Sequence, residues 1–339
     1  MLIIRPIQVG DFEALYQIAE ESGHGFTSLP VNADLLRHKI ARAEASFVKT
    51  VDAPFDEGYL MVLEDTDTRE VVGTCAIEAA VGMEDAFYHY RLGTEVYHSE
   101  QIDVRNEVET LTLCHDYTGA AEMCTLFLRE AYRKGNNGRM LSRSRFLFLA
   151  QHAKRFGETV IAEMRGVSDA DGHSPFYGWL QKHFLGIDFI QADYLSGLGK
   201  KAFMAEMMPR NPVYVCLLPE EAQKVIGEVH TNTRPALSLL QAEGFRCRGY
   251  VDIFDGGPTV ECRLSDIRGV RESRLLTVDI GDMVEADTQF IISNTQLANY
   301  RATSAALAVD DKSEHIIISP ELAAGLLLAK GDQIRILAM

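Results

Sequence analysis

Residues 126–141 read Leu-Phe-Leu-Arg-Glu-Ala-Tyr-Arg-Lys-Gly-Asn-Asn-Gly-Arg-Met-Leu, and this stretch decides the fold. A strand predicted over 122–128 turns through a basic, glycine-containing loop into a helix predicted over 139–156. Such a turn aims several backbone N–H groups and the positive end of a helix at one point, where a pyrophosphate can bind. The alternative is an ordinary strand–helix turn. Neither a Walker A loop nor a GxGxxG dinucleotide fingerprint occurs in the chain.

Strands and helices interleave on both sides of this turn. Apolar spacing predicts a hairpin of two strands joined by an acidic turn, at 58–64 and 71–80. Asp11 is placed to cap a first helix, and the spacing of apolar residues predicts further elements. They are a strand at 2–4, helices at 32–44, 175–184, 219–226 and 235–243, and strands at 109–114, 159–166, 245–254 and 259–264. This order predicts an α+β (mixed α/β) fold.

The tail has a different pattern from about residue 272 onward. Short apolar runs at 275–280, 289–293, 302–309, 315–319 and 333–337 alternate with turns that contain Gly or Asp. We therefore expect two domains, a larger one over 1–270 and a small all-β one over 271–339. The regular succession of short strands predicts that the smaller domain resembles a β-barrel.

Composition excludes several classes of protein. The 339 residues carry a formal charge of −16, with 24% charged and 47% hydrophobic residues. This balance is that of a folded globular protein. Net acidity disfavours binding to a nucleic-acid backbone and is compatible with a small cationic substrate.

Targeting and metal-binding signals are also lacking in the sequence. The longest apolar stretches, such as 322–329, fall short of the roughly 20 residues that span a bilayer. The first twelve residues do not resemble a secretory signal, so we expect a cytoplasmic protein. The six cysteines are far apart and mostly in apolar segments, typical of buried reduced thiols. The histidines have no metal-ligand spacing, and we expect no metal.

The turn at 126–141 resembles the acyl-CoA-binding motif of the GNAT N-acyltransferases, a strand followed by Arg-x-x-Gly-x-Gly and a helix. Arg133 and Gly138 occupy the outer positions of the motif, and Asn136 stands where the family usually has its first glycine. Residues 233–245 resemble the later GNAT segment Asn-x-x-Ala-x-x-Leu-Tyr-x-x-x-Gly-Phe. The opening Ile-Arg-Pro at 4–6 also fits the first strand of that family. The resemblance implies a GNAT-like fold over 1–270.

Within that superfamily the chain resembles arginine N-succinyltransferases. The similarity rests on short segments: Leu29-Pro30, Cys75-Ala-Ile-Glu78, His115-Asp-Tyr-Thr-Gly119, Glu163-Met-Arg-Gly166, Ser174-Pro-Phe176, Lys201-Ala-Phe203 and Phe254-Asp-Gly-Gly-Pro-Thr259. The resemblance implies transfer of succinyl from succinyl-CoA, as co-substrate, to the α-amino group of L-arginine. No permanently bound cofactor is implied. Some members also accept ornithine, and the family forms homo-oligomers or assemblies of paralogous subunits.

The same resemblance implies roles for individual residues. Leu126 is expected to contact succinyl-CoA through its backbone, and Arg133 and Gly138 are expected to hold the pyrophosphate. Many GNAT enzymes use a tyrosine as general acid where this chain has Leu240, which cannot donate a proton. His230 precedes the same helix in a Val-His context and is the expected proton donor. The alternative is that Leu126 and His230 are ordinary structural residues.

Arginine recognition requires carboxylates, because a guanidinium pairs with them through two parallel hydrogen bonds. Glu163, Asp255 and Glu261 are candidates, and the sequence does not choose among them. The run at 114–116, Cys-His-Asp, does not form a catalytic triad, because neighbours on a strand point to opposite faces. A non-catalytic sensor of acyl-CoA or arginine that kept the fold is the remaining alternative.

Overall fold

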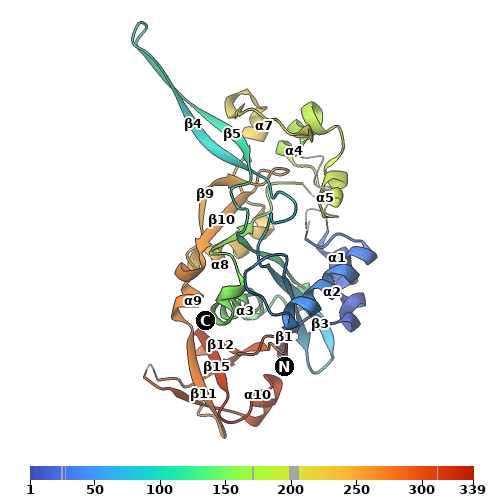
Figure 1. Cartoon of the computed structure of the whole chain (residues 1–339), viewed down its shortest axis with the longest axis vertical. Coiled ribbons are helices and arrows are strands. Elements are labelled where there is room, and N and C mark those ends of the chain that lie inside the picture. The colour runs from blue at the N-terminus through green and yellow to red at the C-terminus, as the bar shows by residue number, and fades with distance from the viewer. Residues whose placement is uncertain (24–25, 27, 170–171, 198–205, 311) are drawn as a thin grey trace.

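The computed structural model describes residues 1–339 except 24–25, 27, 170–171, 198–205 and 311, so the segment 201–203 lies outside the described residues (Figure 1). The described strands join in one sheet, in the order β14-β11-β15-β12-β13-β1-β2-β3-β6-β7-β10-β9-β4-β5-β8. Their bounds are β1 Leu2–Pro6, β2 Gly58–Asp65, β3 Glu70–Glu78, β4 His89–Ser99, β5 Val104–Cys114, β6 Ala121–Leu128, β7 Thr159–Glu163, β8 Val213–Tyr214, β9 Arg246–Val251, β10 Pro258–Arg263, β11 Arg274–Ile280, β12 Gln289–Asn294, β13 Ala302–Ala306, β14 His315–Ile318 and β15 Gln333–Ala338. The predicted mixed α/β class is confirmed.

Helices cover both faces of the central strands. Alternation along β2 sends Met61 and Leu63 into a core with α3, and Leu60 and Val62 into a second core with α1 and α2. The described helices are α1 Phe12–Ser22, α2 Ala33–Val48, α3 Asn137–Gln151, α4 Pro175–Leu180, α5 Phe189–Gly197, α7 Glu220–Gln223, α8 Arg234–Ala242, α9 Arg268–Glu272 and α10 Pro320–Gly325. Helix α8 contributes Leu240 to the α3 core. The strands between these layers are therefore buried on both faces.

The sequence around Asn32 explains where α2 begins, whereas Asp11 has a different role from the predicted helix cap. The Asn32 side chain accepts a hydrogen bond from the Leu35 N–H and caps α2, which runs four residues further than predicted. Asp11 makes no side-chain capping bond to α1. Its carboxylate instead forms a buried ion pair with Arg5 and accepts a hydrogen bond from the Gln8 N–H. This pair ties the first strand to the start of α1.

Two features of the sheet differ from the prediction. Strand β4 was not predicted, and with β5 it forms a long hairpin that projects from the body at the upper left of Figure 1. The C-terminal strands do not confirm a small barrel. They form an open extension in which β14 lies at the edge and β13 pairs with β1 through Ile4 and Ala302. The open edge arises because β11 pairs with β14 and β15, and β14 has no second strand partner in the described chain.

Within the described residues no helix is both long and apolar enough to cross a bilayer. All six cysteines are free thiols, and Cys216 and Cys247 are exposed. The prediction that the thiols are buried is therefore wrong for these two.

Candidate active site

Strand β6 carries a backbone irregularity at Thr125 and Leu126. Against β3, Cys124 pairs with Ala76 and Phe127 pairs with Thr74, so the two intervening residues of β6 face one residue of β3. Thr125 takes up the extra length with a φ of 55°, a left-handed conformation that is costly for a β-branched residue. Such strain persists only where the surrounding fold imposes it, and it concentrates at functional sites.

Strands β6 and β7 separate just before this bulge. Their parallel pairing is limited to Ala121 with Val160 and Glu122 with Ile161. Strand β7 continues to Glu163 paired with β10 on its other side. The edge of β6 that includes Leu126 consequently has no partner from β7, and its backbone groups are available to a ligand.

The loop after β6 presents the start of α3 to solvent. Gly135 has a φ of 55°, and a Cβ added at Gly135 or Gly138 would meet nothing within 4 Å. The Arg133 Nε donates to the Leu128 carbonyl oxygen at 2.7 Å, which folds the loop back against the strand. Asn136, the N-cap of α3, makes no side-chain capping bond. The first turn of α3 therefore has no side-chain cap from Asn136, and there is open space beside Gly135 and Gly138.

Arg145 lies beneath the bulge and was not identified from the sequence. Its side chain, on α3, is 2% exposed, and burial lowers its pKa. It donates to the Cys124 carbonyl oxygen at 3.3 Å and to the Ser142 carbonyl oxygen at 3.1 Å. No carboxylate forms an ion pair with it in the described chain. Its charge therefore acts on the peptide group that joins Cys124 to Thr125.

His230 is fixed to the far end of β7. Val229 and Gly166 form an isolated antiparallel bridge, and the His230 N–H donates to the Arg165 carbonyl oxygen at 2.8 Å. The ring Nδ1 accepts from the Asn232 N–H at 3.2 Å, so the neutral ring carries its hydrogen on Nε2. Partial burial, followed by the nearby Arg165 charge, lowers the pKa of His230 below its ordinary 6.5. The imidazole is therefore neutral at pH 7.

The predicted site residues lie on connected elements. Leu126 and Val229 pack against the same core between the sheet and α3, whereas Leu240 is buried inside that core. Arg133 and Gly138 lie at the loop between β6 and α3. The chain thus brings a strained strand edge, an open helix start and an imidazole to one end of the central sheet.

The three candidate carboxylates have different surroundings. Asp255 is buried and accepts hydrogen bonds from the Gly166 and Gly257 N–H groups at 2.6 and 2.8 Å. Glu261 accepts from the Tyr117 hydroxyl at 2.5 Å and lines a separate cavity of about 360 Å³. Glu163 lies 2.9 Å from the His89 Nε2 and is partly exposed. Asp255 is therefore structural, and Glu163 is the candidate on the strand that holds His230.

Comparison with known proteins identifies the family. The family described as "Arginine N-succinyltransferase beta subunit" matches residues 2–269, and its C-terminal domain matches residues 274–338. Proteins named arginine N-succinyltransferase from Escherichia coli and Salmonella schwarzengrund are each 44% identical over all of this chain and 98% of their own length. The solved structure of arginine/ornithine succinyltransferase subunit AI from Pseudomonas aeruginosa aligns over 100% of this chain and 98% of its own, with 35% identity and a TM-score of 0.91.

The chain belongs to the arginine N-succinyltransferase family. This family is one of acyltransferases, so the site described above belongs to an enzyme. In the part of the chain that the structure describes, no three His, Cys, Asp or Glu side chains cluster as a metal site would require.

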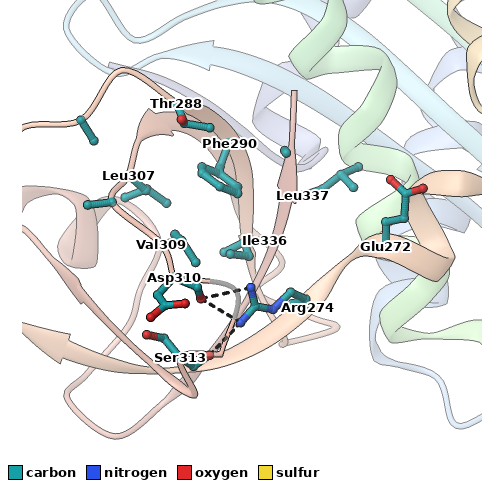
Figure 2. Close-up of a pocket in the computed structure, with 13 residues that line it drawn as sticks. Glu272, Arg274, Thr288, Phe290, Leu307, Val309, Asp310, Ser313, Ile336 and Leu337 are labelled. Carbon is teal, nitrogen blue, oxygen red and sulfur yellow. Dashed lines mark hydrogen bonds between the residues drawn. The ribbon is translucent and has the colours of Figure 1, made fainter.

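This arginine N-succinyltransferase family member also has a cavity of about 820 Å³ beside its C-terminal strands (Figure 2). Phe290, Leu307 and Ile336 line it with apolar surface. The Arg274 guanidinium donates to the carbonyl oxygens of Asp310, at 3.3 Å, and Ser313, at 2.8 Å. Figure 2 shows these bonds at one side of the cavity, where they join β11 to Asp310 and Ser313.

Proposed function

We propose that the protein transfers the succinyl group of succinyl-CoA to the α-amino group of L-arginine. The observation that carries the proposal is the separation of β6 from β7 at a strained bulge, beside the end of β7 that holds His230. The unpaired edge of β6 would leave room for a thioester between the two strands. Membership of the arginine N-succinyltransferase family and the two curated relatives of that name support the choice of substrates.

The donor is proposed to bind along β6 and the start of α3. Its pyrophosphate would accept hydrogen bonds from the N–H groups near Gly138, supported by the positive end of the helix dipole and by Arg133. The thioester carbonyl would lie at the unpaired edge of β6, with the Leu126 N–H as hydrogen-bond donor to the developing oxyanion. Donors arranged in advance for such an oxyanion lower the barrier of acyl transfer.

His230 is proposed to move the proton between the two reacting groups. The neutral amine attacks the thioester carbon, forming the C–N bond while the carbonyl π electrons move to oxygen. The neutral imidazole accepts the proton that the amine nitrogen then loses. When the C–S bond breaks, the resulting imidazolium donates this proton to the CoA thiolate. His230 is thus the proton donor in the second half of the reaction.

Arg165 is proposed to recognise the distal carboxylate of the succinyl group. Its carbonyl oxygen accepts a hydrogen bond from the His230 N–H, and its charge lowers the pKa of that ring. Its guanidinium donates to the Ser168 hydroxyl at 2.9 Å and has no ion pair with a carboxylate in the described chain. A cation in this position favours an acyl group with a terminal carboxylate over acetyl.

A cytoplasmic location and assembly with identical or paralogous subunits are also proposed. Exposed free thiols at Cys216 and Cys247 persist most readily in a reducing compartment. The Pseudomonas aeruginosa protein of similar structure is named as a subunit. We also propose the division into 1–270 and 271–339, which the change to short strands after α9 supports.

The proposal is tested by thiol release from succinyl-CoA or acetyl-CoA with arginine, ornithine or lysine as acceptor. The expected result is turnover with succinyl-CoA and arginine well above every other pair. Ornithine is tested because the name of the Pseudomonas structure includes it. Turnover with both arginine and ornithine would establish dual specificity. No thiol release with any pair, from folded protein that still binds CoA, would contradict the enzymatic role and favour a sensor.

A further inference from the structure

Glu163 lies beside a histidine that has no contact with solvent. The His89 ring is 0% exposed, and its Nε2 lies 2.9 Å from a Glu163 carboxylate oxygen. Phe87 and Tyr117 pack edge-on against the imidazole at centroid distances of 5.0 and 4.9 Å. The Glu163 side chain itself is 27% exposed. One carboxylate oxygen therefore lies close to the buried ring, although neither ring nitrogen makes a hydrogen bond in the described chain, and the side chain still reaches solvent.

Glu163 has two acidic neighbours, Asp252 and Asp255. Asp252 and Asp255 lie close enough for their charges and that of Glu163 to interact. The pKa of Asp252 is raised by burial, then by the charge of Asp255 and that of Glu163. No lysine or arginine forms an ion pair with any of these three carboxylates among the residues that the structure describes. Burial also raises the pKa of Asp255, so the partly exposed Glu163 is the carboxylate of the three that can meet a ligand as an anion, and it would attract a cationic one.

The position of Glu163 at the end of β7 places it near the proposed reacting groups. Glu163 and Arg165 are two residues apart, so an extended chain directs them to the same side, with Cα atoms about 7 Å apart. The Arg165 carbonyl oxygen accepts from the His230 N–H. Pairing with β6 ends at Ile161, two residues before Glu163. Glu163 therefore lies next to the opening between the strands, at a distance that one amino-acid side chain can bridge.

We propose that Glu163, which lies beside the buried His89, binds the positively charged end of the acceptor's side chain. The inference rests on the proposed function and assigns the group that selects a cationic amino acid. The Glu163 carboxylate accepts hydrogen bonds from a guanidinium or primary ammonium group. Asp255 and Glu261 are unsuited to this role, because backbone N–H groups hold the first and Tyr117 holds the second.

The test compares arginine with citrulline, its neutral counterpart, in the wild type and in Glu163→Gln. Loss of a charged hydrogen bond should raise the KM for arginine about 10- to 100-fold. The kcat/KM for citrulline should change much less, so the preference for arginine should largely disappear. Glu163→Asp keeps the negative charge but places it one methylene group further from the ligand. This variant should therefore retain part of the preference for arginine. A Glu163→Gln variant that keeps the full wild-type preference for arginine over citrulline would overturn the proposal.

Glu261→Gln is the matched control, because it removes a carboxylate from the neighbouring strand β10 and should leave the arginine preference unchanged. Melting temperatures show whether each variant is folded. If the wild type does not release thiol with arginine, the proposed reaction fails, and arginine binding is then measured by calorimetry. Binding that is weakened by Glu163→Gln supports the Glu163 site even then. Equal binding by both proteins contradicts it.

Discussion

The molecule has two openings with different character. The opening between β6 and β7 has a strained Thr125, a buried Arg145 and a partly buried His230 around it. The cavity beside the C-terminal strands has a volume of about 820 Å³, yet the described residues that line it include no histidine and no non-glycine residue with a positive φ (Figure 2). Volume therefore does not identify the reaction site here. We instead place the proposed reaction site where strain, an unpaired strand edge and titratable groups occur together.

The largest expected effect is at His230. Replacing it with Ala removes the proton carrier and should lower kcat about 10²- to 10⁴-fold. Binding of CoA should be unchanged, because no contact of His230 lies in the loop that precedes α3. Stopped-flow thiol release and calorimetry measure the two quantities separately. A kcat within a few-fold of wild type would remove His230 from the mechanism.

Arg145→Met tests whether the buried cation supports the bulge. Removing its bond to the Cys124 carbonyl should alter the peptide group before Leu126 and lower kcat about tenfold, the effect of one hydrogen bond to a charged group. The melting temperature should change little, because a buried ion without a carboxylate partner contributes little net stability. Parallel activity and melting measurements decide the point, and a large loss of stability at unchanged kcat would refute it.

Gly138→Ala tests the open start of α3. A Cβ there meets no protein atom within 4 Å, so folding should be unaffected while the added methyl group obstructs a phosphate. The KM for succinyl-CoA should rise about tenfold, equivalent to about 1.4 kcal/mol. Gly178→Ala is the control, because this glycine also has open space and lies in α4. Equal KM values for both variants would argue against pyrophosphate binding at this turn.

The pH profile tests the pairing of Arg165 with His230. The neutral imidazole is the form that accepts a proton, so kcat should fall as the pH drops through the lowered pKa of His230, below 6.5. Arg165→Gln removes a nearby positive charge and should raise that pKa. The acid limb of the variant should therefore begin at a higher pH. An unchanged limb would show that another group controls it.

The smallest effect on catalysis is expected from a substitution of Arg274, which lines the C-terminal cavity. Arg274→Gln should weaken the bonds to the Asp310 and Ser313 carbonyls and lower the free energy of unfolding by about 1–3 kcal/mol. The kcat should stay within twofold of wild type. Urea unfolding and thiol release measure the two effects. A large loss of kcat in a stable variant would move the chemistry toward this cavity.

Local sequence signals were sufficient for the elements that frame the site. Apolar spacing and the basic, glycine-containing turn located β6 and α3, whereas the role of His230 was implied by the family resemblance and stays a prediction. The bulge was not predictable, because a left-handed Thr125 is imposed by pairing with β3 and has no local signature. The pairing of His89 with Glu163 joins strands far apart in sequence. Strand β4 was missed because most of its residues on both faces are exposed, which removes the usual alternation.

Hydrogen–deuterium exchange with and without succinyl-CoA tests most directly which opening binds the donor. The account predicts slower exchange over 124–141, where the unpaired edge of β6 and the first turn of α3 would contact the thioester and pyrophosphate. Exchange over 286–310, beside the C-terminal cavity, should be unchanged. Protection confined to 286–310 would contradict the assignment of the site to the opening between β6 and β7.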